Sequence, residues 1–144
     1  MKKNYDKLLL KNQLCFPVYL CAKEITSRYA PLLEKLDLTY TQYIVMMYFW
    51  EIKKSNVKEA GRALMLDSST LTPLLKKLEN KGYLTRNRST EDERNLVIEL
   101  TKKGLKLREK ALDIPEKIGE CLNLSKKEAE MLYKLTYKVI AKGE

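Results

Sequence analysis

The sequence predicts a mostly α-helical protein of one domain that carries a single β-hairpin. Apolar residues recur at helical spacing over most of the chain. Two short runs, Tyr83–Arg88 and Leu96–Leu100, have the composition and alternation of paired strands. The 144 residues contain no internal repeat or linker-like stretch, so we expect residues 1–144 to form one domain.

The N-terminal part of the chain predicts two helices. Residues 8–35 have the apolar spacing of a long first helix, which Pro17 and Pro31 interrupt because proline lacks an N–H group. Thr39-x-x-Gln42 is a capping box that opens a second helix, which extends through Trp50. This second helix is rich in Met, Tyr and Phe, so we expect it to be buried.

The next segment predicts two helices joined by a tight turn. Asn56-x-x-Glu59 opens a short helix from Val57 to about Leu64. A second helix follows over residues 68–82, where Gly82 is placed to end it. Because proline is tolerated only in a first turn, Pro73 favours a regular helix that begins near Thr70. The apolar face of this helix consists of Leu71, Leu74, Leu75 and Leu78.

The hairpin and two further helices complete the chain. The polar residues 89–95 join the two strands, and a helix runs from Thr101 to about Glu120 with an interruption at Pro115. Ser125-x-x-Glu128 is a capping box for a last amphipathic helix. The order of elements predicts a winged helix-turn-helix over residues 37–101, flanked by helical segments 1–36 and 102–144.

Composition narrows the partners of the protein. The chain has 28 Lys and Arg against 19 Asp and Glu, a formal net charge of +9, which favours nucleic acid, an anionic membrane surface or a solvated basic surface. No apolar run reaches the ~18 residues of a membrane span, and no secretion signal is evident, so we expect a cytoplasmic protein with no membrane partner. Three cysteines and no histidine match no zinc pattern, and we expect no metal and no cofactor.

The helix over residues 68–82 is predicted to enter the major groove of double-stranded DNA. Hydroxyl groups gather at its N-terminal end, lysines follow along it, and arginines surround the hairpin. The acidic hairpin tip is unusual for DNA binding, and one explanation is that Asp92 pairs with Arg94 and orients its guanidinium. The predicted DNA-binding residues are Ser68, Ser69, Thr70, Thr72, Pro73, Lys76, Lys77, Arg86, Arg88, Asp92 and Arg94.

Several motifs in the same order give the chain a resemblance to a known family. Residues 37–101 look like the winged helix-turn-helix of the MarR family, and residues 66–77 and 92–95 are similar to its organic-hydroperoxide-sensing (OhrR-type) branch. Residues 12–16 carry the N-terminal signature of that branch, and residues 112–115 are also similar. The resemblance implies a repressor that binds a near-palindromic operator as a homodimer, with segments 1–36 and 102–144 forming the dimer interface.

The candidate sensing residue is Cys15. A thiolate is the nucleophile that attacks a peroxide, and without histidine its partners must be phenols, backbone N–H groups or cations. Tyr19 lies four residues from Cys15 and shares its helix face, whereas Tyr29 lies roughly 21 Å away along an unbroken helix. The resemblance implies crossed helices in a dimer, in which Tyr29 and Tyr40 hydrogen-bond the sensing thiol of the other subunit. Pro17 either starts the regular helix just after Cys15 or kinks it.

The other two cysteines receive different predictions. The resemblance to two-cysteine members implies that Cys121 resolves the oxidised Cys15 of the partner subunit into a disulfide, the alternative being an inert thiol. Cys21 is expected to be structural, because two cysteines six residues apart on one helix cannot bridge without unwinding it.

The sequence therefore predicts a transcriptional repressor, not an enzyme, that releases operator DNA when organic hydroperoxide oxidises Cys15. Three alternatives stay open: a regulator that binds a noncovalent phenolic ligand, a global thiol-based redox regulator, and a structural nucleoid protein. A thiol peroxidase is a fourth, although it leaves the winged helix and the basic charge without a role.

Overall fold

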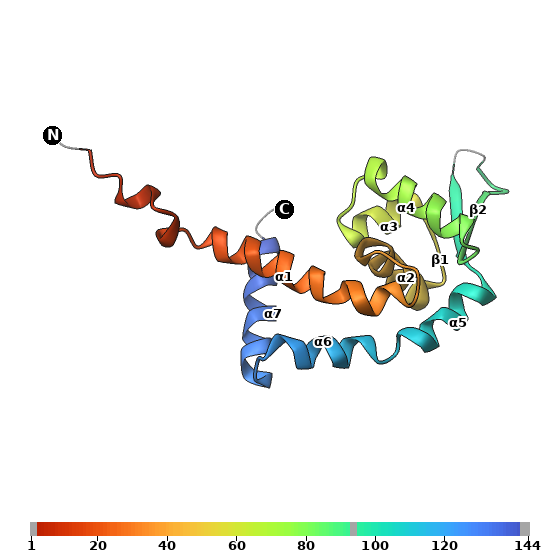
Figure 1. Ribbon diagram of the computed structural model, residues 1–144. Helices are drawn as coiled ribbons and strands as arrows, with labels where there is room; N and C mark the ends of the chain where they lie inside the picture. The colour runs from red at the N-terminus through yellow and green to blue at the C-terminus, as the bar shows by residue number, and fades with distance from the viewer. Residues whose placement is uncertain (1–2, 93–94, 142–144) are drawn as a thin grey trace.

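The computed structural model describes residues 3–92 and 95–141. Over these residues the chain forms helices and one small sheet (Figure 1). Two short 3₁₀ turns, η1 (Asp6–Leu8) and η2 (Leu10–Asn12), precede the first α-helix. The remaining elements are α1 (Cys15–Glu34), α2 (Tyr40–Ile52), β1 (Lys54–Asn56), α3 (Val57–Leu64), α4 (Ser68–Asn80), β2 (Leu84–Arg88), β3 (Leu96–Leu100), α5 (Lys102–Ala111), α6 (Ile114–Leu122) and α7 (Lys126–Ala141).

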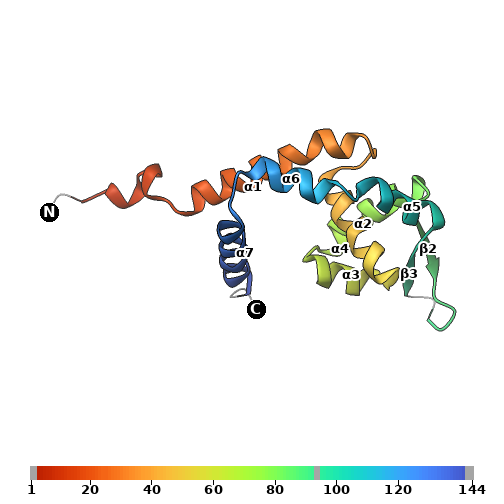
Figure 2. The same cartoon turned by 90° about the horizontal axis from the view of Figure 1, so that it is seen from below.

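The predicted winged helix-turn-helix is confirmed. Helices α3 and α4, joined by a short turn, lie beside the hairpin of β2 and β3 at one end of the molecule (Figure 1). The N-terminal turns and α7 lie at the other end, and α1 and α6 run side by side between the two ends (Figure 2). No helix in the described part of the chain is both long enough and apolar enough to cross a bilayer.

The sheet has one strand more than the sequence predicts. Strand β1 pairs antiparallel with β3, with Ser55 opposite Ile98, and the strand order is β1-β3-β2. The three residues of β1 are polar and show no apolar alternation, so nothing in the sequence indicates a strand there. Strands β2 and β3 form the predicted hairpin, with Arg86 opposite Ile98.

Helix α2 forms the centre of the hydrophobic core. Its capping box is present: the Gln42 backbone N–H donates to Thr39 Oγ1 (3.3 Å), and the Thr39 N–H donates to Gln42 Oε1 (3.1 Å). The same core contains buried residues of α1, α3, α4, the sheet, α5 and α6. The largest fully buried side chains are Phe49, Leu33, Met46, Leu71, Leu75, Leu78, Leu84, Ile98 and Val45.

The predicted first helix over residues 8–35 is too long at its N-terminal end. The α-helix begins at Cys15, and the Gln13 amide donates to the carbonyls of Lys7 (2.7 Å) and Leu9 (3.0 Å) in the preceding turns. Pro17 is the third helical residue, where its missing N–H has no intrahelical partner to lose. Pro31 lies inside α1 and does not end it.

Two other predicted boundaries are also corrected. Helix α4 begins at Ser68 and not near Thr70, because the Asp67 side chain caps it, and Pro73 lies within the helix. The single helix predicted from Thr101 to about Glu120 is two helices, α5 and α6, with Pro115 in the first turn of the second. Proline suits a first turn, so it starts a helix here.

Gly82 and Gly104 fix the junction between α4, the sheet and α5. Gly82 has φ +79°, the left-handed conformation that ends α4 as predicted. Gly104 packs against the chain so closely that an added Cβ would lie 2.3 Å from the Tyr83 carbonyl oxygen. The Gly104 carbonyl accepts a hydrogen bond from the buried Trp50 indole N–H (2.8 Å). The hairpin of β2 and β3, called the wing from here on, is therefore fixed at its base to the centre of the core.

We predict that Gly104→Ala lowers the free energy of unfolding by roughly 1–3 kcal/mol, because the backbone of Tyr83 must move. Gly119 in α6 is the matched control, since an added Cβ there meets nothing within 4 Å. Gly119→Ala is expected to raise the free energy of unfolding by about 0.5–1 kcal/mol. Urea denaturation of both variants tests this, and equal stability of the two would contradict it.

Candidate DNA-binding and thiol sites

Helix α4 presents one face to the core and the other to solvent. Leu71, Leu75 and Leu78 are buried, and their packing fixes which face of the helix points to solvent. On the opposite face the predicted residues Ser68, Ser69, Thr70, Pro73, Lys76 and Lys77 are exposed, while Thr72 is half-buried. The helix therefore offers hydroxyl groups at its N-terminal end and two ammonium groups further along, which suits contact with bases and phosphates.

Asp67 fixes the N-terminal end of α4, and sequence reasoning did not assign it this role. Its Oδ1 accepts hydrogen bonds from the Thr70 backbone N–H (2.8 Å) and the Ser69 hydroxyl (2.5 Å). These bonds, the Ser69 hydroxyl first, lower the pKa of the Asp67 carboxyl below its ordinary value of 3.8. An aspartate three residues before Thr70, at the start of a predicted helix, is the sequence signal that could have identified this cap.

We predict a pH-dependent contribution of Asp67 to stability. Because the folded-state pKa is lowered, the stabilisation is present above about pH 3.8 and is lost as the pH falls through the folded-state value. Asp67→Ala should therefore melt below wild type at pH 7, and the two should converge on acidification. Asp67→Asn keeps the capping acceptor without titrating, so its melting temperature should lack this component. Thermal melts from pH 7 to pH 3 test the prediction, and a constant difference between Asp67→Ala and wild type contradicts it.

The wing presents only some of its predicted DNA-binding residues to solvent. Arg86 donates from Nε to Glu79 Oε2 of α4 (2.7 Å) and is largely buried, so it links the wing to α4. Arg88 is exposed at the end of β2. The Asn95 side-chain amide donates to Asp92 Oδ2 (3.3 Å) in the loop. Arg94 lies outside the described residues, and with it the predicted Asp92–Arg94 pair.

Cys15 is the first residue of α1 and is exposed. The helix therefore begins at Cys15 itself and not after it, and Pro17 lies in the first turn. Tyr19, one turn further on, is 59% exposed, and the Lys23 ammonium lies 5.4 Å from the centre of its ring. The thiol is therefore accessible to a solute and lies at the end of α1 where backbone N–H groups lack intrahelical partners.

Tyr29 and Tyr40 lie together, away from the Cys15 of their own chain. Their ring centres are 4.8 Å apart, and Tyr43, which sequence reasoning missed, lies 5.8 Å from Tyr29. Tyr40 and Tyr43 are three residues apart on α2, a spacing that could have indicated the cluster. Burial, followed by the neighbouring phenol of Tyr40, raises the pKa of Tyr29 above 10.0. Tyr29 therefore keeps its O–H as a hydrogen-bond donor at neutral pH.

The aromatic cluster continues into the DNA-binding lobe. The ring of Tyr43 lies 6.1 Å from that of Trp50, whose indole holds Gly104 at the base of the wing. Burial also raises the pKa of Tyr43, with the phenols of Tyr29 and Tyr40 adding to it. The candidate thiol-binding phenols are thus in direct packing contact with the centre of the winged helix.

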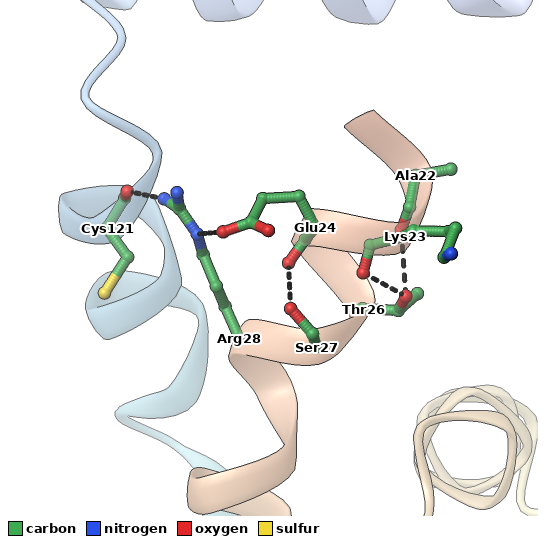
Figure 3. A network of polar contacts seen from close by, with 7 residues as sticks. All are labelled: Ala22, Lys23, Glu24, Thr26, Ser27, Arg28 and Cys121. Atoms are coloured by element: carbon green, nitrogen blue, oxygen red, sulfur yellow. Dashed lines mark hydrogen bonds and ion pairs between the residues drawn. The ribbon is translucent and has the colours of Figure 1, made fainter. Parts of the chain in front are cut away.

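Cys121 lies at the end of α6 beside α1, and its main-chain carbonyl accepts a hydrogen bond from Arg28 Nη1 (Figure 3). Arg28 Nε donates at the same time to Glu24 Oε1 (3.0 Å). The thiol of Cys121 is exposed. Sequence reasoning identified neither Arg28 nor Glu24, since 93 residues separate Arg28 from Cys121. Cys21 is also exposed and lies outside the hydrophobic core.

Many apolar side chains are exposed at the end of the molecule opposite the wing. None of the described residues of α7 is buried, and the same holds for the first nine residues of α1. An apolar surface of this extent is characteristic of a protein interface. Its exposed large side chains are Leu8, Leu9, Leu10, Leu14, Phe16, Val18, Tyr19, Leu20, Met131, Leu132, Tyr133, Leu135, Tyr137, Val139 and Ile140.

The fold and the exposed face of α4 define a winged-helix protein of the DNA-binding class. Residues 27–111 match the SarA/Rot family of transcriptional regulators. The organic hydroperoxide resistance transcriptional regulator of Bacillus subtilis is 48% identical over 135 residues, which cover 94% of this chain and 90% of that protein. The chain therefore belongs to the SarA/Rot transcriptional regulators and is a MarR-type winged-helix regulator, as its motifs predict.

Two solved structures of AbfR from Staphylococcus epidermidis are also similar. Reduced AbfR bound to DNA is 32% identical, with 95% of this chain and 96% of that chain covered and a TM-score of 0.79. Disulfide-containing AbfR is 34% identical, with 95% of each chain covered and a TM-score of 0.64. These relatives are a DNA-binding protein in a reduced state and the same protein in an oxidised state.

Proposed function

We propose that this protein is a homodimeric repressor that holds operator DNA while Cys15 is reduced and releases it when organic hydroperoxide oxidises Cys15. The observation that carries the proposal is the exposed thiol of Cys15 at the start of α1, at the opposite end of the fold from the winged helix. The similarity to a hydroperoxide resistance regulator and to reduced, DNA-bound AbfR supports it. Such a protein acts in the cytoplasm, with the DNA.

The dimer is proposed to form through segments 1–36 and 102–144. The apolar side chains of α1 and α7 are exposed in the single chain, and pairing of two chains would remove them from water. Two winged helices related by a two-fold axis would then read half-sites about 34–36 Å apart. In each, the N-terminal end of α4 contacts the major groove and Arg88 lies on the wing. Arg86 supports the wing through Glu79.

The proposed chemistry is stoichiometric and is not enzyme turnover. The Cys15 sulfur attacks a peroxide oxygen, the O–O bond breaks, and the alcohol leaves with a proton, so the thiol becomes a sulfenic acid. The Cys121 sulfur of the partner subunit then attacks the Cys15 sulfur, the S–O bond breaks and water leaves. The resulting disulfide ties the two subunits in a new arrangement, in which the two α4 helices no longer match successive major grooves.

The test measures operator affinity at one fixed salt concentration, because phosphate contacts make the affinity strongly salt-dependent. Cumene hydroperoxide is expected to release the DNA, and dithiothreitol is expected to restore binding. A salicylate-like acid is the comparison, and release by that acid without cysteine oxidation would favour a noncovalent ligand instead. Equal affinity for operator and random DNA would favour a nucleoid protein, and sustained consumption of hydroperoxide with a reductant would favour a peroxidase.

A further inference from the structure

We propose that Arg28 is a positioning residue that holds Cys121 where it meets the oxidised Cys15 of the partner subunit. This inference rests on the proposed function, since it concerns the step that converts the sulfenic acid of Cys15 into a disulfide. Arg28 belongs to α1 and Cys121 to α6, and the guanidinium joins the two helices at the Cys121 carbonyl (Figure 3).

Geometry assigns the disulfide to two subunits. Arg28 lies thirteen residues after Cys15 on the same helix, roughly 20 Å along its axis. Because Cys121 is held beside Arg28, it lies far from the Cys15 of its own chain. A disulfide requires Cα atoms within about 7 Å, so the two cysteines of one chain do not reach each other. The Cys15 that Cys121 meets therefore belongs to the partner.

The contact with Arg28 places Cys121 near the part of α1 that carries Tyr29, one of the two candidate phenols. Tyr29 follows Arg28 directly in α1, and Tyr40 packs against the ring of Tyr29. If the partner's Cys15 is bound by Tyr29 and Tyr40, Cys121 of the same subunit is held on α6 beside Arg28, the residue that precedes Tyr29 in α1. One subunit then supplies the two phenols and Cys121, and the other supplies the thiol that is oxidised.

The contact with Arg28 has a clear local cause. Helix α6 ends at Leu122, where Asn123 takes the left-handed conformation with φ +51°, so the last carbonyl groups lack intrahelical partners. The guanidinium satisfies the Cys121 carbonyl with one N–H group and Glu24 with another, and this fixes its orientation. Lysine lacks this planar fork and replaces it poorly.

The role is one of position and not of stability. The Arg28 and Glu24 side chains are 37% and 63% exposed, and exposed ion pairs contribute little to folding. Removing the guanidinium should therefore leave the fold intact while the end of α6 loses its attachment to α1. A thiol displaced by about an ångström attacks far more slowly, since reaction rates depend steeply on the placement of the reacting atoms.

The experiment compares Arg28→Gln, Arg28→Lys and wild type under cumene hydroperoxide. Covalent dimer is followed on non-reducing gels, and Cys15 sulfenic acid is followed by dimedone trapping in a Cys121→Ser background. We expect Arg28→Gln to slow covalent dimer formation roughly 10- to 100-fold and Arg28→Lys to be intermediate. Sulfenic acid should form at the wild-type rate in both. Arg108→Gln removes an equal charge from the exposed face of α5 and should change neither rate.

The outcomes separate the two hypotheses. Wild-type disulfide rates in Arg28→Gln would overturn the role of Arg28 alone, and so would equal slowing of both steps, which would place Arg28 at Cys15. Failure of the wild-type protein itself to form a covalent dimer would overturn the pairing of Cys15 with Cys121. If thermal melts show that Arg28→Gln is poorly folded, Glu24→Gln, which removes the carboxylate that orients the guanidinium, is expected to slow the disulfide step alone.

Discussion

Cys15→Ser is expected to stay on operator DNA under a dose of organic hydroperoxide that releases the wild-type protein. Serine has nearly the same shape, so reduced-state binding should be unchanged, but its hydroxyl is not oxidised by hydroperoxide. The wild-type affinity should fall roughly 5- to 150-fold on oxidation, the range of typical coupling free energies between two sites. Electrophoretic mobility shift or fluorescence anisotropy with labelled operator measures the difference.

Cys21→Ser is the matched control for this experiment, because Cys21 is also an exposed thiol on α1. It should be released as readily as wild type. If Cys15→Ser is released by hydroperoxide to the same extent as wild type, the site of sensing lies elsewhere and the thiol at the start of α1 has no regulatory role.

Cys121→Ser is expected to abolish the covalent dimer completely while leaving the first oxidation step intact. The Cys15 sulfenic acid then has no protein thiol placed to attack it, so it persists or reacts with a small thiol. Release of DNA should become slower and depend on added small thiol. A non-reducing gel after brief hydroperoxide treatment detects the covalent dimer, and dimedone labelling detects the sulfenic acid.

Cys21→Ser again provides the comparison, since it should still give the dimer-sized band. Two results are informative in opposite directions. Loss of the band in Cys121→Ser alone supports the assignment of the resolving thiol. A band of wild-type intensity in Cys121→Ser would mean that Cys15 pairs with another thiol, and Cys121 would then be an inert residue of α6.

Much of the fold could be predicted because its signals are local. The capping boxes at Thr39 and Ser125 and the helix stop at Gly82 depend on residues within four positions of each other, and the structure has all three. Strand β1 could not be predicted, because its only reason to be extended is pairing with β3, more than forty residues later. The chain does break near Pro115 as the sequence predicts, but the break lies before this residue, because proline can start a helix as well as interrupt one.

The candidate sites likewise contain features that the sequence predicts and features that it does not. Tyr29 and Tyr40 could be paired through the family resemblance, and the exposed face of α4 follows from the spacing of its leucines. The Arg86–Glu79 pair and the Arg28–Cys121 contact could not be predicted, because each depends on how separate elements pack. Helix rise places Tyr29 and Cys15 about 21 Å apart in one chain, so the proposed thiol site requires a second subunit.

The most direct test of a site shared between subunits is a mixed dimer. One chain carries Cys15→Ser and retains Cys121, and the other carries Cys121→Ser and retains Cys15, with different affinity tags to purify the heterodimer. On hydroperoxide treatment the heterodimer should form a single covalent link and release operator DNA, while each homodimer should form none. Absence of the covalent heterodimer, or a wild-type disulfide that runs as a monomer on a non-reducing gel, would contradict the account.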